Sequence, residues 1–204
     1  MYKKISSYQF DCNVCPTPCD GISKGVYNFK NDVNFAETQE QIIIDHLNRK
    51  GYQAAKCNRE GFPDIIIKKH DKISSYLEVK AQRRTFMQIK KILPQTKLLP
   101  SETLALNKSD LLRYFEIFDR EQQNIFIVWV LQNRPCIVPQ NQSYYYYQNL
   151  SVLRKIYENC GNKRTFKRKS GQGDIVNGAH KGVVVNYHFS LNELIKWNLS
   201  LPDK

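Results

Sequence analysis

The stretch PDIIIKKHDKISSYLEVKAQ, residues 63–82, decides the fold of this chain. An acid opens a run of three isoleucines, a polar turn follows, and a second apolar run carries an acid, an apolar residue and a lysine in sequence. Two β-rich runs separated by a short polar turn predict a hairpin of two antiparallel strands, over residues 64–69 and 75–81.

Alternation along the second strand sorts its side chains onto two faces. Successive strand residues point to opposite sides of a sheet. The polar residues therefore share one face: Tyr76, Glu78, Lys80 and Gln82. The opposite face supplies core and carries Leu77, Val79 and Ala81.

Two carboxylates and one ammonium on neighbouring strands suit a divalent cation held beside a phosphate. Mg²⁺ and Mn²⁺ prefer hard oxygen ligands, so we expect Asp64 and Glu78 to bind the metal, with the Val79 carbonyl as a further ligand. Lys80 would position the attacking water and stabilise the charge on the phosphate. Gln82 would touch the scissile phosphate or orient the lysine.

A helix is expected upstream, beginning near Asn34 and ending at Lys50-Gly51. Asn34 and Glu37 fit a capping box, and an apolar stripe follows: Ala36, Ile43, Ile44 and Leu47. Glu40 lies on this stripe, and an acid on a buried face needs a reason. We expect Glu40 to complete a second metal site or hold a metal-bound water, whereas Glu37 is better explained as a cap.

The remaining elements are expected in the following order. Residues 1–33 and 94–107 read as irregular, and the strands are expected at 52–56, 125–131 and 183–189, the middle one buried on both faces. Helices are expected at 85–93, 110–120, 150–158 and 190–197, the last capped by Ser190 and Glu193. The run Tyr144 to Tyr147 is either a packed strand, which we favour, or an aromatic surface that stacks on bases.

Pro63-Asp64 followed by Glu78-Val79-Lys80 resembles the motif of the PD-(D/E)XK nuclease superfamily, whose fold is restriction-endonuclease-like. The stretch Glu40 to Leu47 followed by Gly51-Tyr52 is similar to the first helix of that family. The resemblance covers about residues 34–131. It implies an α/β fold with a mixed central sheet flanked by helices, a nuclease core at 34–140, an irregular N-terminal segment at 1–33, and a basic C-terminal addition at 141–204.

The function that this resemblance implies is a Mg²⁺-dependent DNA endonuclease that hydrolyses phosphodiester bonds by metal-activated water. A sequence-specific enzyme of restriction or homing type is the favoured interpretation. A repair or junction-resolving nuclease is the first alternative, and a catalytically silent DNA-binding or RNA-processing protein is the second. A homodimer is expected, because one such site cuts one strand.

Charge and composition agree with a nucleic-acid partner. A chain of 204 residues with 41% hydrophobic residues suits one packed domain, and its net charge of +12 favours a polyanion. The apolar runs are too short for a membrane span, and the missing signal core makes a cytoplasmic location the expectation. The expected DNA contacts are Arg83, Arg84, Lys90, Lys163, Arg164, Lys167, Arg168 and Lys169.

Three cysteines lie close together near the N-terminus: Cys12, Cys15 and Cys19. They could hold Zn²⁺ or an iron–sulfur cluster if a fourth ligand joins them, and the candidates are Cys57, Cys160, His180 and His188. Free or paired thiols are the alternative, because a second pair of closely spaced cysteines is missing.

Overall fold

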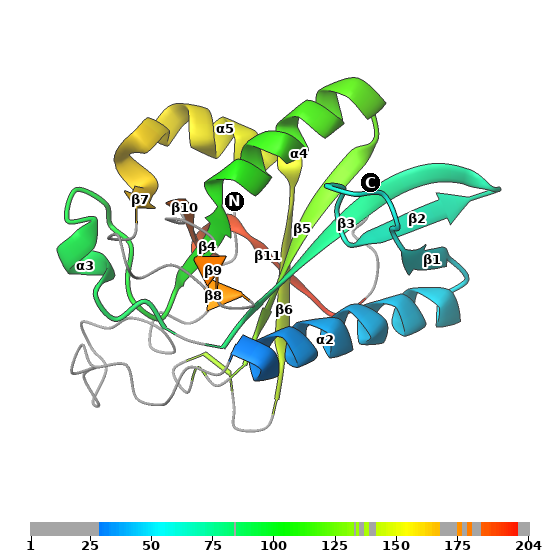
Figure 1. The fold of residues 1–204 in the computed structure, drawn as a ribbon, viewed down its shortest axis with the longest axis horizontal. Coiled ribbons are helices and arrows are strands. Elements are labelled where there is room, and N and C mark those ends of the chain that lie inside the picture. Colours follow the sequence, from blue (N-terminus) through cyan, green and yellow to red (C-terminus); the bar gives the residue numbers. More distant parts are fainter. Residues whose placement is uncertain are drawn as a thin grey trace.

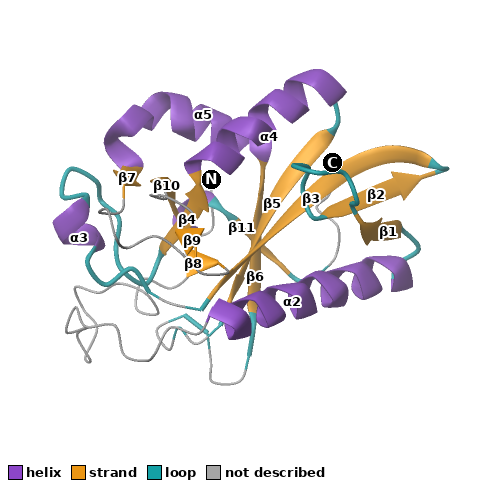
Figure 2. Cartoon of the chain, in the orientation of Figure 1, coloured by secondary structure: helices purple, strands orange, loops and turns teal. Residues whose placement is uncertain are grey.

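A six-stranded mixed sheet forms the centre of the protein, with helices on both of its faces (Figure 1, Figure 2). The computed structural model describes residues 29–83, 85–132, 134, 137–138, 142–167, 175–176, 179–180 and 185–199. The expected architecture, a mixed central sheet flanked by helices, is confirmed.

The central sheet has the strand order β1-β2-β3-β5-β6-β11. Its strands are β1 Gln53–Lys56, β2 Ile65–Lys69, β3 Lys72–Gln82, β5 Asn124–Leu131, β6 Tyr144–Asn149 and β11 Ile195–Trp197. β3 and β5 run parallel, and the other neighbours in this sheet are antiparallel. The predicted hairpin is confirmed, because β2 and β3 pair with Ile65 opposite Leu77.

The parallel pair β3–β5 requires a crossover, and helix α4, Lys108–Glu121, lies in that connection. The side chain of Asn107 caps α4 by accepting from the Ser109 N–H. β5 is buried on both faces, as its apolar sequence predicts, because Val128 and Trp129 point to opposite faces, belong to different clusters and both have no exposed surface.

Different helices cover the two faces of the sheet. α2, Phe29–Arg49, lies along one face, where Ile43 and Leu47 pack in one cluster with Ile65, Leu77 and Val79 (Figure 1). α4 and α5, Leu150–Cys160, lie on the other face. The cluster on that side contains Tyr76, Leu111, Tyr114, Trp129 and Leu153. The predicted alternation along β3 is confirmed, since Tyr76 and Leu77 belong to different clusters.

A second, three-stranded sheet lies beside the central one, with the order β4-β10-β7. Its strands are β4 Thr103–Asn107, β10 Val185–Ser190 and β7 Thr165–Lys167. The loop predicted where β4 lies is wrong. The strand forms because it pairs with β10, about eighty residues further along the chain, and the local sequence carries no sign of that partner. The described residues also include a short pair, β8 Ile175–Val176 and β9 Ala179–His180.

Two predicted helices have different bounds in the structure. α2 begins at Phe29, so Asn34 lies inside it, and the Asn34 carbonyl accepts from Thr38 Oγ1 at 2.8 Å. Residues 29–33 contain neither proline nor glycine, so nothing in them stops the helix from extending upstream of Asn34. The N–H groups after Asn34 then bond to carbonyls of the preceding turn and need no side-chain cap. The helix predicted at 85–93 shortens to α3, Ile89–Ile92, and the side chain of its N-cap residue, Gln88, makes no capping hydrogen bond.

The C-terminal helix predicted at 190–197 is wrong. The capping box of Ser190 and Glu193 forms, but it caps only the 3-10 turn η2, Leu191–Glu193. β11 follows instead, because the open edge of β6 offers backbone partners and Trp197 becomes buried against it. β6 and β11 are thus strands of the central sheet, although they lie in the segment predicted as an addition to the core.

The tyrosine run belongs to β6, as the packed-strand interpretation predicts. Tyr146 and Tyr147 are both buried, and β6 pairs with β5 on one side and β11 on the other. α5 follows directly, with the Asn149 side chain as its cap, which confirms the short helix predicted there. None of the helices in the described ranges is long and apolar enough to cross a membrane.

Candidate active site

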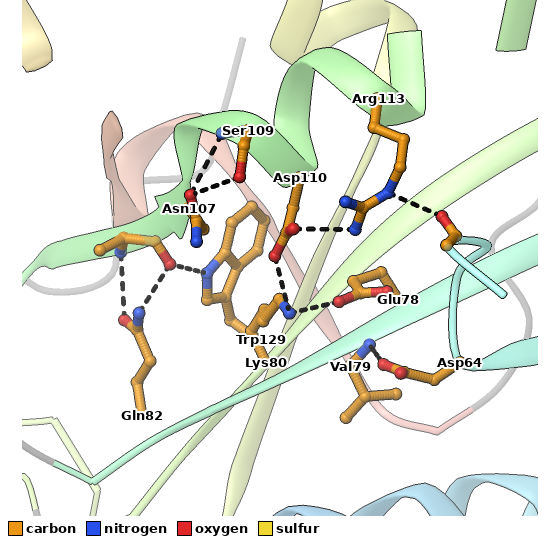
Figure 3. Close-up of polar contacts among 12 residues, drawn as sticks. Asp64, Glu78, Val79, Lys80, Gln82, Asn107, Ser109, Asp110, Arg113 and Trp129 are labelled. Carbon is orange, nitrogen blue, oxygen red and sulfur yellow. Dashed lines mark hydrogen bonds and ion pairs between the residues drawn. The ribbon is translucent and has the colours of Figure 1, made fainter. Parts of the chain in front are cut away.

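Asp64 and Glu78 meet across the β2–β3 hairpin. Ile65 pairs with Leu77, so the next residues outward in this antiparallel register are Asp64 and Glu78. The Val79 N–H donates to Asp64 Oδ2 at 2.8 Å, which fixes the carboxylate beside the strand (Figure 3). The structure therefore brings both predicted metal ligands to one place.

Burial makes the charged forms of both carboxyls unfavourable. Burial raises the pKa of Asp64, the Val79 N–H and the Lys80 ammonium oppose the rise, and the charge of Glu40 adds to it. The Glu78 side chain is only 2% exposed, so burial raises its pKa as well. The charge of Asp64 raises the pKa of Glu78 further, whereas the Lys80 ammonium acts to lower it. A cation that approaches the pair would offset this cost.

Lys80 is the ammonium of the site. Its Nζ forms an ion pair with Glu78 Oε1 and lies 3.8 Å from Asp110 Oδ2 on α4 (Figure 3). Burial acts to lower the pKa of Lys80, but Glu78, Asp64 and Asp110 outweigh it and raise that pKa. Lys80 is therefore positively charged at neutral pH and suited to stabilise negative charge.

Glu40 approaches Asp64 from α2. Its side chain is 14% exposed and pairs with Lys56 Nζ at 3.3 Å, at the end of β1. Its carboxylate is close enough to raise the pKa of Asp64. Glu37, one turn earlier, is exposed. The arrangement agrees with the expectation that Glu40, and not Glu37, faces the site.

Asp110 and Arg113 are site residues that the sequence analysis misses. Asp110 Oδ1 accepts from Arg113 Nη2 at 2.8 Å, and Arg113 Nε donates to the Gly61 carbonyl at 2.8 Å (Figure 3). Arg113 thus ties α4 to the loop that leads into Asp64. The spacing i, i+3 predicts an ion pair on one helix, but only the docking of α4 over β3 brings that pair to Lys80.

Tyr114 completes the buried wall beside Glu78. It is 2% exposed, and burial followed by the charge of Glu78 raises the pKa of its hydroxyl. The phenol therefore stays protonated, and its hydroxyl lies beside the Glu78 carboxylate as a neutral group. In the sequence Tyr114 reads only as one of several aromatic residues of the helix.

Gln82 lies at the end of β3, and its amide is engaged with the second sheet. Its Nε2 donates to the Ala105 carbonyl at 2.7 Å, and its Oε1 accepts from the Ala105 N–H at 3.3 Å. Arg134 Nη2 also donates to Oε1, at 3.4 Å. Trp129 Nε1 donates to the same Ala105 carbonyl (Figure 3). Through these hydrogen bonds the Gln82 side chain links β3 to β4.

Replacement of Gln82 with alanine should lower the free energy of unfolding by about 1–3 kcal/mol, the usual cost of leaving buried polar groups without partners. Urea unfolding measures this change. Gln41→Ala is the control, since among the described residues the Gln41 side chain bonds to Asp45 on the exposed side of α2, and its loss should cost under about 0.5 kcal/mol. Equal stability of the two variants would contradict the bridging role.

The donor set fits a hard divalent cation. Glu78 Oε2 is buried and accepts no hydrogen bond from the described part of the chain, so one carboxylate oxygen is left over beside Asp64. Buried carboxylate oxygens are the ligands that Mg²⁺ uses. The described residues do not form a complete set of protein ligands for a metal, because no group of three or more His, Cys, Asp or Glu residues among them is spaced to hold one.

The expected DNA contacts fall into two groups. Lys90, Lys163 and Lys167 are exposed. Arg164 is instead turned inward, 17% exposed, and pairs with Glu193 Oε2 at 2.7 Å, because η2 is capped at the same point. Arg83 is partly buried, with its guanidinium 5.1 Å from the centre of the Phe35 ring.

Several predictions fall outside the described residues. These concern the cysteine cluster and three of the basic residues: Cys12, Cys15, Cys19, Arg84, Arg168 and Lys169. Of the suggested fourth ligands, Cys57 and Cys160 are partly buried thiols. His188 is buried, with Nδ1 3.1 Å from the Arg164 carbonyl.

Comparison with known proteins gives a weak structural likeness and no match of sequence. No protein-family model matches the chain, and no curated protein does. Among solved structures, the chain is similar to Hjc, a Holliday junction resolvase from the archaeal hyperthermophile Archaeoglobus fulgidus. The TM-score is 0.43 at 9% sequence identity, over 78% of this chain and 86% of that one. A likeness of this degree assigns neither a substrate nor an activity to the chain.

Proposed function

We propose that the protein is a Mg²⁺-dependent DNA endonuclease of the PD-(D/E)XK type. The observation that carries the proposal is the meeting of the partly buried Asp64 carboxylate and the buried Glu78 carboxylate, with the Lys80 ammonium beside Glu78 on β3. A phosphodiester needs positive charge on its oxygens as it is attacked, and this cluster can offer a divalent cation and a lysine side by side.

Each residue has a distinct part in the proposed reaction. Asp64 and Glu78 would hold the cation, with Glu40 as an outer carboxylate that faces Asp64. When bound, the cation supplies Lewis acidity and lowers the pKa of water. Lys80 stays protonated and stabilises the negative charge that develops on the phosphate. Tyr114 and the packed face of α4 keep bulk water away from Glu78.

The DNA would lie across a basic surface that we define by Lys90, Lys91, Lys97, Lys163 and Lys167. These five lysines are exposed, and they come from residues 85–99 and 159–167, which contain no aspartate or glutamate. Two basic segments without acids of their own suit a phosphate backbone.

Packing holds the two segments of the basic surface together. Phe166 of β7 packs against the cluster of Ile89, Leu93 and Leu98. Gln95 Nε2 donates to the Lys163 carbonyl at 2.7 Å, which links the loop after α3 to η1, Gly161–Arg164. Two stretches more than sixty residues apart in sequence thus present one charged surface.

A substrate panel tests the proposal. The purified protein is incubated with duplex DNA, single-stranded DNA, a four-way junction and RNA, each with Mg²⁺, Mn²⁺ or EDTA. Cleavage of DNA that needs the metal and is lost in Asp64→Asn supports the proposed function. Binding without cleavage favours the silent DNA-binding alternative, and preferential cleavage of RNA favours the RNA-processing one.

The pattern of cleavage refines the proposal. Discrete ends on phage or plasmid DNA support the restriction or homing type, whereas cleavage confined to the junction supports the junction-resolving alternative. We propose a homodimer for double-strand cleavage, because each chain contributes one such site. Light scattering of the protein with and without duplex measures the state of assembly.

Reversing two charges on the basic surface should weaken DNA binding with a clear salt signature. Lys163→Glu with Lys167→Glu is expected to reduce the slope of log affinity against log salt by about 2, roughly one per lost phosphate contact. Fluorescence anisotropy with labelled duplex in EDTA measures it without cleavage. Lys68→Glu with Lys72→Glu in the β2–β3 hairpin makes the same change in net charge and is the control. Equal loss in both variants would contradict the surface.

A further inference from the structure

The Lys80 ammonium lies between two carboxylates on different elements. Glu78 on β3 holds it in an ion pair, and Asp110 Oδ2 on α4 is 3.8 Å away. The Lys80 side chain is 30% exposed and can shift, whereas Glu78, at 2%, is fixed in the wall of the site. Either acid, Glu78 or Asp110, can therefore form an ion pair with the Lys80 ammonium.

A metal on Glu78 would disturb this arrangement. Glu78 Oε1 is engaged by Lys80, so a divalent cation that binds the carboxylate meets the ammonium at close range. Two cations on one buried carboxylate repel each other strongly, because little solvent screens them. Lys80 must then move toward the other acid within reach, and among the described residues the ion pairs of Lys80 are those with Glu78 and Asp110.

Asp110 is held in place to receive the lysine. Its other oxygen, Oδ1, accepts from Arg113 Nη2 at 2.8 Å, and Arg113 is anchored on the Gly61 carbonyl. Gly61 has φ +75°, and a Cβ there would lie 3.3 Å from Arg113 Cδ, so the close approach favours glycine. The Asp110 carboxylate thus keeps its orientation whether or not Lys80 is bound to it.

We propose that Asp110 is a positioning residue that takes Lys80 from Glu78 when the metal binds. This inference rests on the proposed function, because it assumes a cation at Asp64 and Glu78. In the metal-free protein the Lys80 ammonium forms an ion pair with the Glu78 carboxylate and balances its charge. In the loaded protein Lys80 pairs with Asp110 and points its charge at the phosphate. Asp110 touches neither the metal nor the substrate.

Metal affinity measured by calorimetry with Mn²⁺ tests the exchange. Asp110→Asn should bind Mn²⁺ about tenfold more weakly, because the displaced ammonium loses its second acceptor. Asp119→Asn is the matched control on the same helix, since Asp119 pairs with Arg154 on the surface and its loss should leave the affinity unchanged. Asp110→Glu should recover most of the affinity, and circular dichroism checks that each variant is folded.

A double-mutant cycle separates positioning from direct ligation. Lys80→Met should bind Mn²⁺ more tightly than the wild type, since the competing ammonium is gone. In that background, Asp110→Asn should change the affinity less than about twofold. A tenfold loss in the Lys80→Met background would overturn the inference, because Asp110 would then act on the metal itself.

Two further outcomes decide between the inference and the function beneath it. If Asp110→Asn and Asp119→Asn bind Mn²⁺ equally well while the wild type cleaves DNA, the inference is overturned and the proposed function stands. If the wild type shows no Mn²⁺ binding that Asp64→Asn removes, the proposed function falls and the inference falls with it.

Discussion

Asp64→Asn is expected to reduce the rate of metal-dependent DNA cleavage by about 10³-fold or more. The substitution removes one of the two carboxylates that we propose to bind the metal, and a catalytic metal supplies several kcal/mol of charge stabilisation in the transition state. Asparagine has the same shape, and its side-chain oxygen can still accept from the Val79 N–H. Single-turnover cleavage at saturating Mg²⁺ measures the loss.

The same variant should be more stable than the wild type without metal. Burial raises the folded-state pKa of Asp64, so the wild type loses stability as the pH rises through that value. Asparagine removes this loss, and the advantage should be largest above the folded-state pKa of Asp64 and shrink as the pH falls below it. Thermal unfolding in EDTA at several pH values measures it. A variant that is inactive and less stable would indicate misfolding and contradict the prediction.

Trp129→Ala is expected to be the most destabilising single substitution in the sheet, at about 3–5 kcal/mol. Trp129 has no exposed surface, and its ring packs 5.8 Å from that of Phe189 in β10. It lies opposite Lys80 in the β3–β5 register, and its Nε1 donates to the Ala105 carbonyl. For a chain of this length the loss corresponds to a fall in Tm of roughly 6–20 °C.

Trp129→Phe separates the two parts of this effect. Phenylalanine keeps most of the buried ring and loses only the hydrogen bond to Ala105, so the cost should be about 1–2 kcal/mol. Calorimetry of both variants gives the comparison. If alanine and phenylalanine cost the same, the cavity is not the main term and the account of the core beside Lys80 is wrong.

Local sequence was sufficient wherever the physical cause is local. The β2–β3 hairpin is an example, because strand alternation alone places Glu78 and Lys80 on the same face and Asp64 follows from the register. The buried strand β5 is another, since an unbroken apolar run has few other solutions. The inward position of Glu40 follows from helical period in the same way.

The errors arise where a distant partner overrides the local signal. The segment of β4 is predicted as a loop, but it forms a strand because it pairs with β10. The capping box at Ser190 predicts the start of a helix, but the residues after η2 pair with the edge of β6 and form β11. Backbone groups of another segment decide each case.

From the sequence alone, strand spacing and alternation predict that Asp64 and Glu78 meet and that Lys80 shares the face of Glu78, and the order of the elements predicts the mixed α/β fold. The docking of α4 above β3, which brings Asp110 within 3.8 Å of Lys80, follows only from the tertiary packing. The same docking places Tyr114 beside Glu78 and ties Arg113 to Gly61. A crossover helix can cover a sheet in several registers, and the packing of its buried side chains selects one.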